Sequence, residues 1–344
     1  MQRIATLSLL SVALGSFSAG SGAQPGYLVQ AGAAAQATHL LVVDKSAGEL
    51  LIVDLESGDV TGRIAVGFEP HEVVALAAED SPTGSPLAIV SLYGTGQQPG
   101  SELAVVDLLE GTVRRVALEP YGRPHGLAFI PGSAAVLVTV EADDTVLTVD
   151  YSRNEITAAW QVEARLPHLV VAAAEGDAAY ASSIVGGAVT RLPLNGGEPE
   201  SASVGAGAEG IAVTPDGREV WVGSNEENEL HVFSDRLTQL DVLPTCGVPI
   251  RVTSVGQELM AVTCMADNRV QLFDVDSHEV VVSIELPMPG GRPVGTLASA
   301  DGSRLFVADT AHGRVYEIDI AAASVLRTFE TGVEPDGLAL IRLP

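Results

Sequence analysis

The chain has 344 residues, of which 47% are hydrophobic and 18% charged, so it has enough apolar side chains for a core and is not intrinsically disordered. Its 44 acidic residues against 18 basic ones give a formal net charge of −26. A surface with this charge repels phosphate groups, which argues against nucleic acid as a partner. The same charge attracts cations and basic proteins, although a gain in solubility alone would also account for it.

The N-terminal residues are typical of a secretory signal peptide. Arg3 gives a positive start, and residues 4–14 are apolar but too short to span a bilayer. Ser21 and Ala23 supply the small residues of a cleavage site. We therefore expect residues 1–23 to be removed on export.

Two parts of the chain follow this signal. Residues 24–38 are rich in Ala, Gly and Gln and are predicted to form a flexible lead-in, while residues 39–344 are predicted to fold as one domain. No later stretch reaches about 18 uninterrupted apolar residues, so we expect no membrane segment once the signal is removed. The sequence thus predicts a periplasmic or secreted protein, and we expect a monomer.

Residues 39–344 repeat a unit of four short β-strands with a period of roughly 40–45 residues, which is typical of β-propellers. Alternating apolar residues, β-branched side chains and Asp-Gly turns mark the strands and hairpins. The second strand of each unit recurs at 39–43, 86–91, 135–140, 178–182, 219–223, 258–263 and 304–308. A third strand ending in or near Asp follows, as at 50–54, 103–107, 146–150, 270–274 and 315–319. An outer strand comes next, as at 60–66, 113–118, 280–286 and 325–330.

A strand rich in small residues separates these groups and usually opens with Pro. It recurs at 70–77, 124–130, 167–173, 208–214, 249–255, 293–299 and 335–341. Small side chains suit the inner strand of a blade, where strands crowd around the axis. The final inner strand has no partners after it, so we expect it to complete the first blade and latch the ring. The sequence thus predicts an all-β, seven-bladed propeller with four-stranded blades.

Two segments carry a resemblance to a known family. Residues 215–217 form a Pro-Asp-Gly turn before the strand at 219–225, and Arg304–Asp309 follows a similar turn. These segments resemble the repeats of YVTN-type β-propellers, and the resemblance covers residues 39–343. It implies the propeller fold but not one function, since such propellers include lactonases, lyases, metal-binding proteins and scaffolds.

The seven inner strands can be aligned on their first residue, which is usually Pro and which we call the opening position. The residue that follows it marks a candidate site. Two blades have Ile250 and Val294 there. The other five, which are consecutive around the ring, have metal-ligand types: His71, His125, His168, Glu209 and Asp336. Equivalent positions of a propeller lie at one level, so these side chains are predicted to meet at one mouth of the central channel.

Three imidazoles with carboxylates form a ligand set suited to Zn²⁺, and also to Cu²⁺, Fe²⁺ or Ni²⁺. The sequence therefore predicts a divalent transition-metal site, with zinc as the favoured ion. The alternative is structural: Pro-His-Gly often opens this strand in such propellers, and the His then packs at the channel mouth.

Loops between the second and third strands are predicted to lie on the same face. Any of their polar residues could shape a pocket there, although most are typical of turns. They are Asp44, Tyr93, Glu141, Asp143, Asp144, Asn225, Glu226, Asp267, Asp309 and His312. Arg123, before Pro124, could bind a substrate carboxylate.

The two cysteines fit the same architecture. Cys246 precedes an inner strand, Cys264 ends the second strand, and the hairpin between them is centred near residue 255. An antiparallel hairpin centred there places them opposite each other. In an exported protein they are predicted to form a disulfide.

Three functions remain open. The cysteine pair and the Pro-His-Gly strand starts show a looser similarity to zinc-metallochaperone propellers, which implies a metal carrier that serves a periplasmic metal-binding or transport protein. The chain departs from that pattern because residues 24–38 contain no His and Ile250 occupies the sixth blade. The second function is a metal-dependent lactonase or lyase, with Glu209 or Asp336 as general base. The third is a scaffold that binds protein or glycan.

Overall fold

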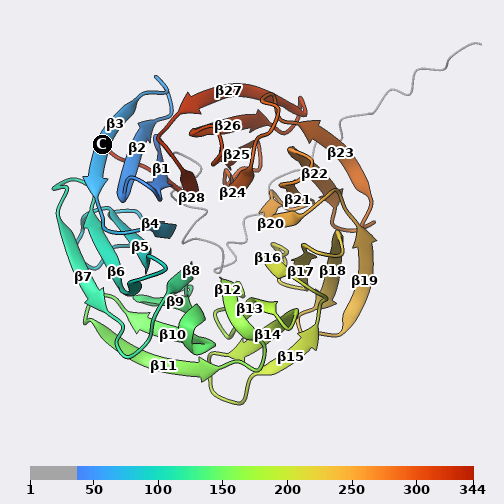
Figure 1. The fold of residues 1–344 in the computed structure, drawn as a ribbon, viewed down its shortest axis with the longest axis horizontal. Coiled ribbons are helices and arrows are strands. Elements are labelled where there is room, and N and C mark those ends of the chain that lie inside the picture. Colours follow the sequence, from blue (N-terminus) through green and yellow to red (C-terminus); the bar gives the residue numbers. More distant parts are fainter. Residues whose placement is uncertain (1–36) are drawn as a thin grey trace, which may run out of the picture.

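Seven four-stranded antiparallel sheets form a closed ring in the computed structural model, which describes residues 37–344 (Figure 1). Within that range the only helical element is a 3₁₀ turn at Glu141–Asp143. The predicted all-β, seven-bladed propeller is therefore confirmed. The predicted signal peptide at 1–23 and most of the lead-in at 24–38 lie outside the described residues.

Each blade is built in the same order from the channel outward. The inner strands are β28 (Pro335–Ile341), β4 (Pro70–Leu76), β8 (Pro124–Phe129), β12 (Arg165–Ala172), β16 (Ala208–Val213), β20 (Pro249–Val255) and β24 (Pro293–Ala298). The second strands are β1 (His39–Asp44), β5 (Leu87–Gly94), β9 (Ala135–Val140), β13 (Ala178–Val185), β17 (Glu219–Ser224), β21 (Leu259–Cys264) and β25 (Arg304–Asp309).

The third and outer strands complete the blades. The third strands are β2 (Glu49–Asp54), β6 (Pro99–Asp107), β10 (Thr145–Asp150), β14 (Ala188–Pro193), β18 (Glu229–Ser234), β22 (Arg269–Asp274) and β26 (Arg314–Asp319). The outer strands are β3 (Val60–Ala65), β7 (Val113–Ala117), β11 (Glu155–Gln161), β15 (Glu200–Ser203), β19 (Gln239–Pro244), β23 (Val280–Glu285) and β27 (Ser324–Glu330). We number the blades from one to seven, beginning with the sheet that contains β1.

The ring closes where the two ends of the domain share blade one. The last strand, β28, pairs antiparallel with β1, so the predicted latch is present (Figure 1). The buried carboxylate of Asp44, at the end of β1, accepts hydrogen bonds from the backbone amides of Val333 (2.8 Å), Glu334 (3.1 Å) and Ala47 (3.3 Å). Asp44 therefore fixes the loop that leads into the closing strand.

The hydrophobic core lies between the faces of neighbouring blades. Leu41 of β1, for example, belongs to one buried cluster with Val90 of β5 and Ala104 of β6. Near the channel the inner strands approach so closely that some positions admit only glycine. A Cβ atom at Gly126 would lie 2.6 Å from the carbonyl oxygen of His168, and one at Gly337 would lie 2.4 Å from that of His71.

Every inner strand pairs irregularly with its neighbour near its start. In blade two the ladder shifts register between Pro70 and Val73, and an equivalent shift occurs in each of the other six sheets. A β-bulge of this kind redirects side chains that a regular ladder would hold on a fixed face. The residue after the opening position, where the sequence predicts the metal ligands, lies within this bulge.

Cys246 and Cys264 form the predicted disulfide, with their Cα atoms 5.7 Å apart. The bond connects the loop before β20 to the end of β21, on the face where the inner strands begin. No helix among residues 37–344 is long and apolar enough to cross a membrane.

We predict that Asp44→Ala lowers the free energy of unfolding by about 3 kcal/mol, because it removes the buried carboxylate that accepts three backbone amides at the latch. Urea unfolding followed by circular dichroism would measure this change. Asp59→Ala is the matched control, since Asp59 is exposed and should matter by less than about 0.5 kcal/mol. Equal unfolding midpoints for the two variants would show that Asp44 does not secure the ring.

Candidate metal centre

Three imidazoles from consecutive blades lie against one another at the channel mouth. His71 on β4, His125 on β8 and His168 on β12 each occupy the bulge at the start of their strand. The ring centroids of His71 and His125 are 4.7 Å apart, and those of His125 and His168 are 3.9 Å apart. The repeat thus brings together side chains that are far apart in the sequence.

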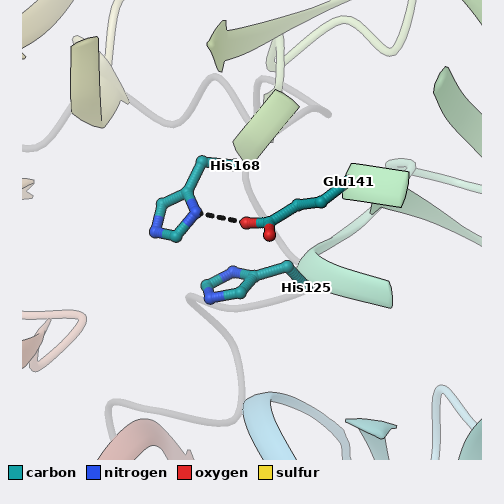
Figure 2. A group of neighbouring side chains, drawn as sticks. All are labelled: His125, Glu141 and His168. Atoms are coloured by element: carbon teal, nitrogen blue, oxygen red, sulfur yellow. Dashed lines mark hydrogen bonds and ion pairs between the residues drawn. The ribbon is translucent and has the colours of Figure 1, made fainter. Parts of the chain in front are cut away.

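Two carboxylates bracket His168. Glu141, from the 3₁₀ turn after β9, directs one oxygen toward Nδ1 of His168 at 2.6 Å (Figure 2). Its other oxygen accepts a hydrogen bond from the Tyr93 hydroxyl at 2.6 Å. On the other side, Nε2 of His168 lies 3.1 Å from Oε1 of Glu209. Burial by itself lowers the pKa of His168, but the hydrogen bonds to Glu141 and Glu209 outweigh it and raise the pKa to about 9.

The other two imidazoles are in a different electrostatic state. Burial lowers the pKa of His71 to about 4, and its Nδ1 lies 3.0 Å from the carbonyl oxygen of Glu69. Burial, and then the charge of His168, hold the pKa of His125 well below its ordinary value. The buried Nδ1 of His125 has no hydrogen-bond partner among the described residues. Both rings are therefore neutral at pH 7 and have lone pairs that can bind a cation.

One group of atoms has the spacing of a metal site. His125, Glu141 and His168 each offer a ligand atom, and these atoms lie within 4.8 Å of one another (Figure 2). Zinc binds imidazole nitrogen and carboxylate oxygen at about 2.0–2.2 Å, so one ion would replace the proton and the hydrogen bond that now join Nδ1 of His168 to Glu141.

The five predicted ligands divide into two groups. His71, His125, His168 and Glu209 lie together, although Glu209 also accepts a hydrogen bond from the side-chain amide of Asn225. Asp336 instead lies 3.4 Å from Nζ of Lys45 and 3.7 Å from the guanidinium of Arg251. The structure does not test whether any of the five binds a metal, so the ligand roles stay a prediction.

A buried ion pair crosses the channel beside the imidazoles. Arg251 of blade six donates to the carboxylate of Glu72 of blade two, and its Nε donates to the carbonyl oxygen of Val294 at 3.1 Å. Burial raises the pKa of Glu72, although the charge of Arg251 opposes this shift. Both residues come second after the opening position, where four other blades have glycine: Gly126, Gly210, Gly295 and Gly337. Glu72 and Arg251 were not identified from the sequence. Alignment of the second residue after the opening position would have done so, because both are charged where most blades have glycine.

Most of the predicted loop residues stabilise turns. Tyr93 and Asn225 do join the site, through Glu141 and Glu209, and the Arg123 guanidinium lies 4.9 Å from the centre of the Tyr93 ring. The predicted binding of a substrate carboxylate by Arg123 stays a prediction. Five of the predicted aspartates accept a hydrogen bond from a backbone amide in a nearby turn: Asp44, Asp143, Asp144, Asp267 and Asp309. His312 pairs with Asp309.

Buried hydroxyls of the second strands hold the bulges in place. The Thr139 hydroxyl accepts from the amide of Gly126 (2.7 Å) and donates to the carbonyl oxygen of His168 in the next blade (2.8 Å). Ser182 donates to the carbonyl oxygen of Glu209 at 2.5 Å in the same way. Each hydroxyl thereby positions the site-bearing strand of the following blade.

The comparisons with known proteins support the fold alone. No protein-family model matches the sequence, and no curated protein is significantly similar to it. A functionally unknown protein from Desulfotomaculum acetoxidans superposes with a TM-score of 0.72 at 13% identity, over 89% of this chain and 100% of that one. Hydrazine synthase from Kuenenia stuttgartiensis gives 0.67 at 16% identity, over 87% and 99% of the two chains. A streptogramin B lyase gives 0.65 at 13% identity, over 79% and 87%.

We predict that Thr139→Val destabilises the protein by about 2–4 kcal/mol, because the isosteric side chain leaves the Gly126 amide and the His168 carbonyl group buried without a partner. Urea unfolding would measure the change. Thr112→Val, at an exposed outer-strand turn, serves as the control and should have almost no effect. If both valine variants are as stable as the unmodified protein, the hydroxyl does not hold the bulge.

Proposed function

We propose that this protein binds one divalent transition-metal ion, zinc by preference, at the mouth of its central channel. The observation that carries the proposal is the buried Nδ1 of His125, which has no hydrogen-bond partner within residues 37–344 and whose ring packs against that of His168. Buried polar atoms are rarely left unpaired, because loss of water without a new partner costs free energy. A metal ion would supply the missing partner.

The ligands we propose come from the same cluster. His125, His168 and Glu141 provide two nitrogens and one oxygen, a set that zinc accepts. The ring of His71 packs edge-to-face against that of His125 and could provide a fourth ligand, while Glu209 orients His168 through its other nitrogen. Asp336 is paired with Lys45 and Arg251, and its charge also acts on His71.

A carrier role is the use of the site that we favour. The acidic chain, with a formal net charge of −26, concentrates cations around it. The ligands lie at one end of the channel, where the inner strands begin, so a partner would have to take the ion from this end of the ring. The partner would be a periplasmic metal-binding or transport protein, in line with the resemblance to zinc-metallochaperone propellers.

The second candidate is a metal-dependent lactonase or lyase. The observation in its favour is Arg251, a guanidinium whose side chain is 12% exposed and whose charge acts on both His125 and Glu209. Because Arg251 is already paired with Glu72, it would act through its charge and stabilise negative charge that develops on a substrate beside a Lewis-acidic metal, a task that a carrier does not need. Turnover of a lactone by the zinc-loaded protein, lost in Arg251→Met, would favour this candidate.

We predict that His125→Ala/His168→Ala binds one equivalent of zinc less than the unmodified protein. Equilibrium dialysis at physiological ionic strength, followed by mass spectrometry of the bound metal, would measure this difference, because salt screens weak binding to surface carboxylates. His39→Ala is a matched control, since His39 lies at the start of β1 and pairs with Asp54.

Circular dichroism would confirm that the variants are folded. Glu141→Gln, which keeps the size of the side chain, should weaken binding without removing the imidazoles. Equal zinc content in the unmodified protein and in His125→Ala/His168→Ala would rule out the channel site.

A further inference from the structure

A second group of potential ligands lies on blade five, away from the channel mouth. It comprises Glu227 in the turn between β17 and β18, together with Glu229 and His231 on β18. Each offers one ligand atom, and these atoms lie within 4.8 Å of one another. We propose that these three residues form a second site for a divalent transition metal, independent of the channel site.

His231 is the main reason for this proposal. Its side chain is buried, with 8% of the residue exposed, and neither ring nitrogen forms a hydrogen bond within the described part of the chain. Nε2 lies 3.5 Å from Oε2 of Glu229, which is close enough for an ion pair with a protonated ring but lies at the outer limit of a hydrogen bond, and burial lowers the pKa of His231 and so opposes protonation. A buried imidazole with two unpaired nitrogens needs a partner, and a metal ion between it and the carboxylates would provide one.

The repeat itself shows that a histidine is not required at this position. The residues that correspond to His231 in the other third strands are Leu51, Ala104, Leu147, Thr190, Gln271 and Tyr316. The three polar ones all have hydrogen bonds: Thr190 to Ser201, Gln271 to the amide of Cys246, and Tyr316 to Asp309. Of the four polar residues at this position, only His231 has no hydrogen bond within residues 37–344.

The backbone places the three side chains on one side of the blade. Glu229 and His231 are two residues apart on a strand, so they point to the same face. The carboxylate of Glu227 folds back over the connection from blade four, where a Cβ atom at Gly205 would lie 2.2 Å from Oε2 of Glu227. Gly205 also has a φ of +117°, which other residues rarely adopt. Because glycine has no side chain, the carboxylate of Glu227 can lie against its backbone.

The chemistry of the group specifies the class of ligand. One imidazole and two carboxylates suit Zn²⁺, Mn²⁺ or Fe²⁺, and the two negative charges balance a dication. Glu227 is exposed and gives a route of entry from solvent, while His231 anchors the ion against the interface between blades four and five.

The test uses the protein carrying His125→Ala/His168→Ala, in which the channel site is removed. Dialysis against Zn²⁺ should leave about one bound equivalent in this background. Adding Glu227→Gln/Glu229→Gln should remove that equivalent, whereas adding Glu226→Gln, at an adjacent exposed acid, should not. Cu²⁺ bound in the same background should show electron paramagnetic resonance couplings to one nitrogen, from His231.

The outcomes separate the two sites. Absence of bound zinc in the His125→Ala/His168→Ala background would overturn the second site and leave the channel site standing. Equal zinc in the background with and without Glu227→Gln/Glu229→Gln would also overturn it. One equivalent that survives the channel substitutions and disappears with Glu227→Gln/Glu229→Gln would establish the second site, even if the unmodified protein bound no more than that.

Discussion

Closure of the ring is the constraint on which the rest of the structure depends. The β28–β1 ladder, with Asp44 fixing the loop before it, joins the two ends of the domain in one sheet. Once the ring is closed, seven inner strands must share the space around one axis. Close approach then requires glycine at positions such as Gly126 and Gly337, and the bulges turn the neighbouring side chains into the mouth. The candidate metal centre therefore arises from the same crowding that defines the fold.

Charge is distributed unevenly around that mouth. On one side, neutral His71 and His125 lie beside His168, which is ion-paired with carboxylates. On the other side, Arg251 reaches across the channel to Glu72. A buried charge is stable only with a partner. The charges on the two sides of the mouth are therefore compensated by different partners. The ion pair is complete within the protein, whereas the unpaired nitrogen of His125 leaves the imidazole side open to a ligand.

The sequence was sufficient for the fold and for part of the site. Strand periodicity and the lone inner strand at the C-terminus predicted seven blades and the latch, because both follow from a side-chain pattern that is repeated in every blade. Alignment of the strand starts also predicted that His71, His125 and His168 meet. The sequence placed Glu141 only among the loop residues that could shape a pocket, and it could not predict that Glu141 contacts His168 or that Asp336 turns toward Lys45, since side-chain direction depends on bulge geometry and on local charges that no repeat specifies.

In a repeat protein, each residue can be compared with the equivalent residues of the other blades. Both proposed sites were identified by this comparison. Each position has counterparts in the other blades that perform the same structural task. Where those counterparts are apolar or hydrogen-bonded and one residue is ionisable, buried and unpaired, the fold does not explain that residue. His231 satisfies this criterion more sharply than His125, because Pro-His occurs in three blades and can belong to the repeat, whereas His231 has no histidine counterpart. The blade-five site is harder to recognise in the sequence than the channel site. The structural role of its repeat position, however, gives less reason for a histidine at 231 than at 125.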